Sequence, residues 1–121
     1  TPALALYNSG WAYYNLQNYD MALSKYYEAL RQDRSSVLQP QIEKNIGLIF
    51  VKKNNLAVAA DHFKKAIALN ASLYDVHFFL AETYLKIRDK QNAKIHFQKV
   101  IDLAPQSSFA QKAQEYLQTM N

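Results

Sequence analysis

The histidines are the residues of this chain whose types and spacing suggest metal or acid–base chemistry. They are His62, His77 and His96, and the first and last of them lie 34 residues apart. A metal shared between them needs further ligands, yet the chain has no Cys and no HExxH motif. Glycine-rich nucleotide motifs and the GxSxG nucleophile motif are also missing. We therefore predict no metal, no cofactor and no enzymatic activity, and we expect ordinary surface histidines.

A second group of residues is suited to binding rather than to catalysis. Tyr7, Trp11 and Tyr14 are four and three residues apart, so on a helix they share one face. Aromatic side chains with a polar end provide large contact areas at low entropic cost. Aromatic stripes also form helix cores, so the elements that hold these three residues decide between the two interpretations.

These elements follow from a threefold repetition in the sequence. Gly10, Gly47 and Ala81 each precede a similar set of residues, found three, twelve, sixteen and nineteen positions further on. The sets are Tyr13, Ala22, Tyr26 and Ala29; Phe50, Ala59, Phe63 and Ala66; and Tyr84, Ala93, Phe97 and Val100. The small residue advances by 37 positions and then by 34. Such a period predicts stacked pairs of antiparallel helices that cross where the small residues lie.

Turns and caps complete the expected helix pairs. Turns are predicted at residues 17–18, 54–55 and 88–89, where Asn18, Asn55 and Asp89 can cap the following helix. A last amphipathic segment places Phe109 and Tyr116 on its apolar face. We interpret it as the polar-faced end helix that a solenoid needs, rather than as a membrane-surface helix, because its polar face has one Lys and no Arg.

The small, aromatic and alanine positions resemble the tetratricopeptide repeat family over residues 3–105. The resemblance implies an all-α, right-handed solenoid of seven helices in a single domain. Its repeats are expected at about 3–36, 40–73 and 74–106, with a capping helix at about 107–120 and a longer first inter-repeat turn around residues 33–37. The segment GWAYYNLQNYDMAL is similar in sequence to bacterial repeat lipoproteins, including those that help to assemble type IV pili. Cytoplasmic and bacterial-envelope locations both stay open, and this sequence similarity favours the envelope.

Composition narrows the possible partners. No apolar run approaches the roughly 20 residues of a membrane span. The whole net charge of +4 lies in residues 41–104, which indicates either an acidic partner or a solvated helical surface. The chain begins at Thr1 with neither Met nor a hydrophobic leader, which predicts a fragment or a mature form without its targeting signal.

The resemblance also implies a site, because the first helix of each repeat in this family lines a concave surface that binds peptides. The matching positions here are Leu4, Tyr7, Trp11, Tyr14 and Asn15; Gln41, Lys44, Leu48, Val51 and Lys52; and Asp75, Phe78, Glu82, Leu85 and Lys86. Asn8 and Asn45 occupy equivalent positions, from which an amide can hold a peptide backbone. We expect an apolar track flanked by lysines, unless a helix upstream of Thr1 covers its aromatic part.

Some family members clamp the carboxylate terminus of chaperones with two Lys, two Asn and one Arg. The matching positions here are Tyr7, Trp11, Asn45, Asp75 and Phe79, of which only Asn45 agrees. An Asp in place of a Lys repels a carboxylate. The sequence therefore argues against a co-chaperone of this kind.

The sequence features bear on three classes of function. The leading prediction is a non-catalytic adaptor that holds a peptide or partner helix through apolar or aromatic anchors in the groove. The alternative is an assembly module that associates with itself or docks further repeats. Nucleic-acid binding is not expected, because Lys44, Lys52 and Lys86 make a weak phosphate track and no base-reading element is present.

Overall fold

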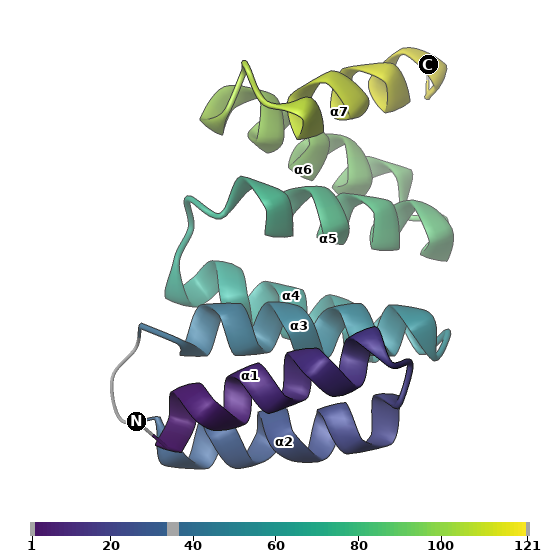
Figure 1. Ribbon diagram of the computed structural model, residues 1–121. Helices are drawn as coiled ribbons and strands as arrows, with labels where there is room; N and C mark the ends of the chain where they lie inside the picture. Colours follow the sequence, from purple (N-terminus) through teal and green to yellow (C-terminus); the bar gives the residue numbers. More distant parts are fainter. Residues whose placement is uncertain (1, 34–36, 121) are drawn as a thin grey trace.

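The computed structural model describes residues 2–33 and 37–120, which form seven α-helices and no strand. The helices are α1 (Pro2–Asn15), α2 (Tyr19–Gln32), α3 (Gln39–Lys52), α4 (Leu56–Leu69), α5 (Tyr74–Ile87), α6 (Lys90–Leu103) and α7 (Ser108–Thr119). They stack in antiparallel pairs from α1 to α7 (Figure 1), so the predicted all-α solenoid is confirmed. Most of the longer turn expected around residues 33–37 lies outside the described residues.

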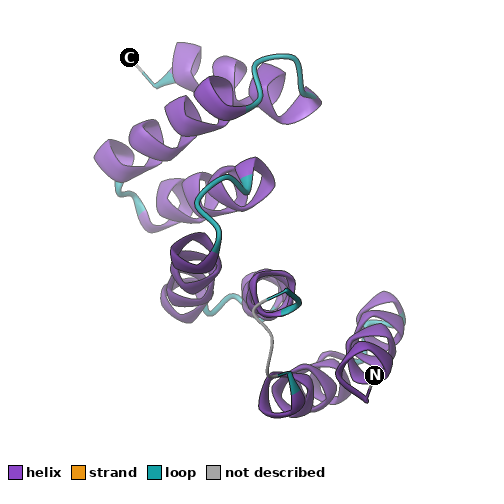
Figure 2. Cartoon of the chain, turned by 90° about the vertical axis from the view of Figure 1, so that its left-hand side faces the viewer, coloured by secondary structure: helices purple, strands orange, loops and turns teal. Residues whose placement is uncertain are grey.

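The first helices of the pairs build one face of the stack. Within each repeat α1 packs on α2, α3 on α4 and α5 on α6, while α4–α5 and α6–α7 contacts join successive units. The helices α1, α3, α5 and α7 also contact one another in turn, and in Figure 1 they lie in front of their partners. Figure 2 shows that the upper helices are rotated relative to the lower ones. The stack therefore presents a continuous surface of first helices.

The helix crossings have the composition that the repetition predicts. A Cβ atom added to Gly10 would lie 2.7 Å from the ring of Tyr26, and one added to Gly47 would lie 2.6 Å from the ring of Phe63. Both rings are fully buried, so the glycines allow a close approach that any larger residue would obstruct. Each of the three core clusters contains one such ring and joins a repeat to the helix that follows it: Tyr26 packs with residues of α3, Phe63 with residues of α5, and Phe97 with residues of α7.

The turns within the pairs reverse the chain through one left-handed residue each. Gln17, Asn54 and Arg88 have φ angles of 61°, 59° and 73°. The expected caps Asn18 and Asp89 accept hydrogen bonds from the third residue that follows each of them. Asn55 also occupies the N-cap position of α4, as predicted, but its side chain makes no capping hydrogen bond, so only the expected bond is wrong.

The last helix closes the stack as expected. α7 buries Ala110, Ala113 and the adjoining Met120 against the core of the third repeat, and its Tyr116 stacks on Phe97 with ring centroids 4.7 Å apart. No helix in the described part of the chain combines the length and the hydropathy that crossing a membrane requires.

The histidines are not ordinary surface residues, which corrects the sequence-based expectation. His62 is buried, and its Nδ1 lies 2.7 Å from a carboxylate oxygen of Glu43. At the equivalent place one repeat later, the Nδ1 atoms of His77 and His96 lie 3.0 Å apart. Both pairs join the first and second helices of a repeat, because Glu43 and His77 are 34 residues apart, as are His62 and His96. The repeat geometry thus brings together polar side chains that the sequence keeps 19 residues apart.

Candidate functional site

A central pocket lies on the face of the first helices, where α1, α3 and α5 meet. Its volume is about 180 Å³. Its walls are Tyr14, Leu48, Val51, Lys52, Phe79, Glu82, Thr83 and Lys86. The structure therefore brings together six residues that the repeat positions predicted for the groove, five of them from α3 and α5 and one, Tyr14, from α1. Phe79 and Thr83 are additions that the position matching did not assign to it.

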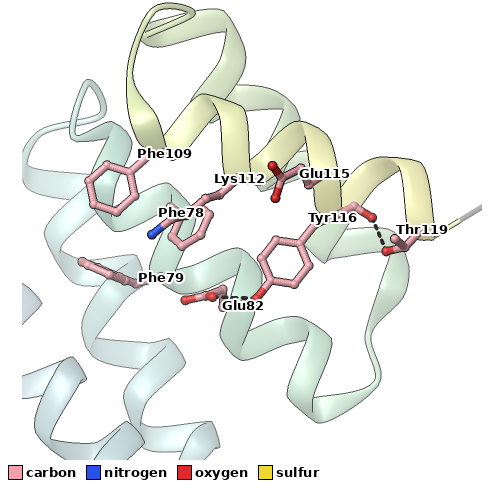
Figure 3. A pocket seen from close by; sticks show the side chains of 8 residues that line it. All are labelled: Phe78, Phe79, Glu82, Phe109, Lys112, Glu115, Tyr116 and Thr119. Carbon is pink, nitrogen blue, oxygen red and sulfur yellow. Dashed lines mark hydrogen bonds between the residues drawn. The ribbon is translucent and has the colours of Figure 1, made fainter.

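A second, larger pocket, here called the terminal pocket, lies between α5 and α7. Its volume is about 680 Å³. It is lined by Phe78, Phe79 and Glu82 from α5 and by Phe109, Lys112, Glu115, Tyr116 and Thr119 from α7 (Figure 3). Phe79 and Glu82 belong to both pockets, so the two pockets adjoin along α5, and together they are called the groove below.

Sequence reasoning missed the contribution of α7 to this site. Phe109 and Tyr116 lie seven residues apart on one helix face, and we interpreted them only as the inner side of a cap. Both rings are half-buried rather than buried, because each also borders the terminal pocket. The same spacing thus serves the core and the groove together.

The rings of the terminal pocket support one another. Phe109 lies 5.1 Å from Phe78 and 5.8 Å from Phe79, measured between ring centroids. Phe78 is only 4% exposed, so this predicted groove residue forms the floor of the pocket and belongs mainly to the core. Such mutual contact fixes the walls before any ligand arrives.

Other predicted residues lie apart from the two pockets. Trp11 is 46% exposed and stacks on Tyr14 with ring centroids 5.5 Å apart, which extends the aromatic surface along α1. Tyr7 is half-buried beside Tyr26, and Asn8 is exposed. None of Tyr7, Asn8 and Trp11 lines either pocket.

Asn45 is placed differently from the prediction. It is only 3% exposed, and its amide donates a hydrogen bond to the hydroxyl oxygen of Tyr26 at 3.2 Å. The amide therefore joins α3 to α2 and does not face a peptide in the groove. The physical reason is the neighbouring repeat, whose buried tyrosine needs a partner for its hydroxyl group.

Several charges of this face are already paired. Lys44 forms an ion pair of 3.3 Å with Asp75. The hydroxyl group of Tyr116 donates to the carboxylate of Glu82 at 2.8 Å, and this bond raises the pKa of Tyr116 above its ordinary value. Lys52 and Lys86 are exposed and form no ion pair within the described residues. The charged walls of the central pocket are therefore two ammonium groups and the carboxylate of Glu82, with a net positive charge.

The site offers surface chemistry suited to contact with another molecule. Within residues 2–33 and 37–120, no three His, Cys, Asp or Glu side chains gather in a metal-binding arrangement. The groove instead combines aromatic and aliphatic walls with a few charged side chains at its edges. This combination is typical of pockets that bind ligands through apolar contact and orient them by polar groups.

The stacked helix pairs and their lined face define an α-solenoid of the helical-repeat class. Sequence models of the tetratricopeptide repeat match residues 4–36, 45–73 and 74–107. The chain therefore belongs to the tetratricopeptide repeat family.

Solved structures with the same fold extend over nearly the whole chain. The first tetratricopeptide domain of Spaghetti (RPAP3) bound to the HSP90 peptide SRMEEVD superposes with a TM-score of 0.86 at 23% identity, covering 98% of this chain and 92% of that one. The OM64 domain of Arabidopsis gives 0.87 at 17% identity, covering 99% and 97%. A solution structure of the human RPAP3 domain gives 0.83 at 23% identity, covering 98% and 94%. No curated protein matched the chain.

Proposed function

We propose that this protein is a non-catalytic interaction module that holds a peptide or a helix of a protein partner in the groove. The observation that carries the proposal is that the central and terminal pockets adjoin, with shared walls on α5 and further walls on α1, α3 and α7. A groove of this length, with apolar walls and charged edges, suits an extended or helical segment. Trp11 and Tyr14 continue the apolar surface toward the first repeat.

The comparison with the RPAP3 domain supports binding of a protein segment, but by different contacts. That protein holds an HSP90 peptide. Here the positions that would clamp a terminal carboxylate hold Trp11, Asp75 and Phe79, and the matching Asn45 is bonded to Tyr26. We therefore propose that the chain does not require a free carboxylate terminus in its partner. The peptide SRMEEVD serves as a comparison ligand, and amidation of its terminal carboxylate should not change its binding to this chain.

The proposal is tested by replacing an exposed aromatic of the groove face. Trp11→Ala removes the exposed ring that stacks on Tyr14, a wall of the central pocket, and should weaken binding of the natural partner by about thirtyfold, as truncation of an aromatic contact residue commonly does. Leu16→Ala is the matched control, because Leu16 is 75% exposed at the end of α1 and lines neither pocket. Calorimetric titration of the purified partner gives the affinities, and circular dichroism verifies the helix content. Equal affinity of both variants would move the binding surface away from the groove.

An assembly module is the second candidate, and one observation favours it. A shallow hollow of about 390 Å³ opens between α6 and α7 at the end of the stack, with Ile101 and Leu117 among its lining residues. Leu103 is also exposed on α6. Apolar side chains at the end of a solenoid suit docking of a further repeat or of a second copy. Concentration-dependent light scattering tests this candidate, and a bacterial-envelope complex stays a prediction.

A further inference from the structure

The terminal pocket has the properties of an anchor site for one large side chain. Its volume of about 680 Å³ lies within the range of roughly 300–1,000 Å³ that is usual for ligand pockets, and it exceeds that of the central pocket. Half-buried rings of Phe79, Phe109 and Tyr116 form its walls above the buried Phe78. An aromatic or large aliphatic group is the guest that such walls favour.

The hydrogen bonds around the pocket hold its two helices together. Tyr116 of α7 donates to Glu82 of α5, and both residues line the pocket (Figure 3). Because the carboxylate of Glu82 already accepts this hydrogen bond, it is less dependent on a cationic group from a ligand. Lys112 and Glu115 also line the pocket, and their formal charges sum to zero. The pocket itself therefore selects for an apolar group rather than for a charge.

The adjoining central pocket favours an acidic side chain instead. Lys52 and Lys86 lie in the last turns of α3 and α5, and in the described part of the chain neither has an ion-pair partner. Glu82 is the acidic wall of the same pocket, and it accepts a hydrogen bond from Tyr116 while keeping its negative charge. An acidic side chain that enters the central pocket thus meets two ammonium groups and one carboxylate, which leaves a net positive charge.

We infer that the groove binds an internal segment of a protein partner that carries an aromatic or large aliphatic residue next to acidic residues. The apolar side chain fills the terminal pocket, and an acidic side chain reaches Lys52 and Lys86. The shared walls Phe79 and Glu82 place the two contacts on one continuous ligand. This inference rests on the proposed function and deepens it, because it names the chemistry of the partner and gives the main anchor to α5 and α7 rather than to α1.

The test uses fluorescein-labelled peptides of about ten residues, acetylated and amidated so that no terminal charge contributes. Each contains Gly and Ser, one Phe and a pair of Glu, with the separation between Phe and Glu varied across the set. Fluorescence polarisation should find a preferred separation. Replacing Phe by Ala in that peptide should weaken binding by about thirtyfold. Replacing Glu by Gln should weaken it by about three- to tenfold at low salt, and high salt should remove this difference.

Two substitutions of exposed residues on α7 test the location. Glu115→Phe places a ring at the edge of the terminal pocket and should weaken binding of the preferred peptide by about thirtyfold. Gln111→Phe adds the same ring at an exposed position that lines neither pocket, and this variant should bind within about twofold of the unchanged protein. Thermal unfolding verifies that both variants fold.

The possible outcomes separate this inference from the broader proposal. Peptide binding that is independent of Phe, or equal in Glu115→Phe and Gln111→Phe, would overturn the anchor site, as would a peptide set that binds no better than a scrambled sequence. If Trp11→Ala weakens binding of the natural partner but Glu115→Phe does not, the groove retains its proposed function and the proposed anchor site is wrong. Insensitivity of the natural partner to both variants would remove the groove function itself.

Discussion

Acid should destabilise this protein through the pair of histidines in the third repeat. The Nε2 atom of His77 lies 2.9 Å from the carbonyl oxygen of Ala71, so this nitrogen carries a hydrogen and donates it. The Nδ1 atom of His77 then accepts a hydrogen bond from the Nδ1–H of His96. Burial is the main cause that lowers the pKa of both rings, and it brings the pKa of His96 to about 4 with help from His77 and the nearby lysines. The folded protein therefore holds the pair neutral.

The sign and size of the effect follow from proton binding in the unfolded chain, where the pKa of His96 returns to 6.5. Below that pH the unfolded state binds a proton that the folded state resists, so the free energy of unfolding falls as the pH approaches 4. Between about pH 7.5 and about pH 5 this shift corresponds to about 2 kcal/mol. Because His96 is partly exposed, solvent screening reduces the expected loss to roughly 1 kcal/mol.

Urea unfolding at the two pH values, followed by circular dichroism, measures this loss. His96→Gln is the informative variant, because its amide can still donate to His77 but does not titrate. We expect the unchanged protein to lose roughly 1 kcal/mol more than the variant on acidification. Equal losses in the two proteins would refute the assignment of acid sensitivity to this pair.

Three further predictions concern packing. Gly47→Leu should lower the free energy of unfolding by about 1–3 kcal/mol, because the added side chain meets the ring of Phe63. Lys65→Leu, on an exposed face, is the control and should change this free energy little. Equal midpoints of urea unfolding in the two variants would contradict the helix crossing. Asn45→Ala should cost about 1–3 kcal/mol in the same assay by leaving the Tyr26 hydroxyl without its partner, and an unchanged midpoint would mean that water replaces the amide. Removal of α7 should expose the core of the third repeat and cause aggregation in light scattering; a monomer of equal stability would make α7 a dispensable tail.

Local periodicity accounts for what could be predicted from the residues alone. The spacing of Gly10, Gly47 and Ala81 predicts the helix crossings, because similar small and aromatic residues recur at the same offsets in all three repeats. The cap Asn18 is equally local, since it bonds a backbone group three residues away. The apolar stripe of α7 predicts a packed end helix for the same reason.

Contacts between elements decided the rest. The sequence placed Asn45 and Phe78 on the groove face, but only the neighbouring helices determine that Asn45 bonds to Tyr26 and that α7 covers Phe78. The partners of the buried histidines likewise come from a second helix, so no periodicity within one helix reveals them. A helical wheel gives the direction of a side chain, whereas its exposure depends on what packs against that face. The terminal pocket therefore belongs to the tertiary structure, since its walls come from two helices that meet only when the solenoid stacks.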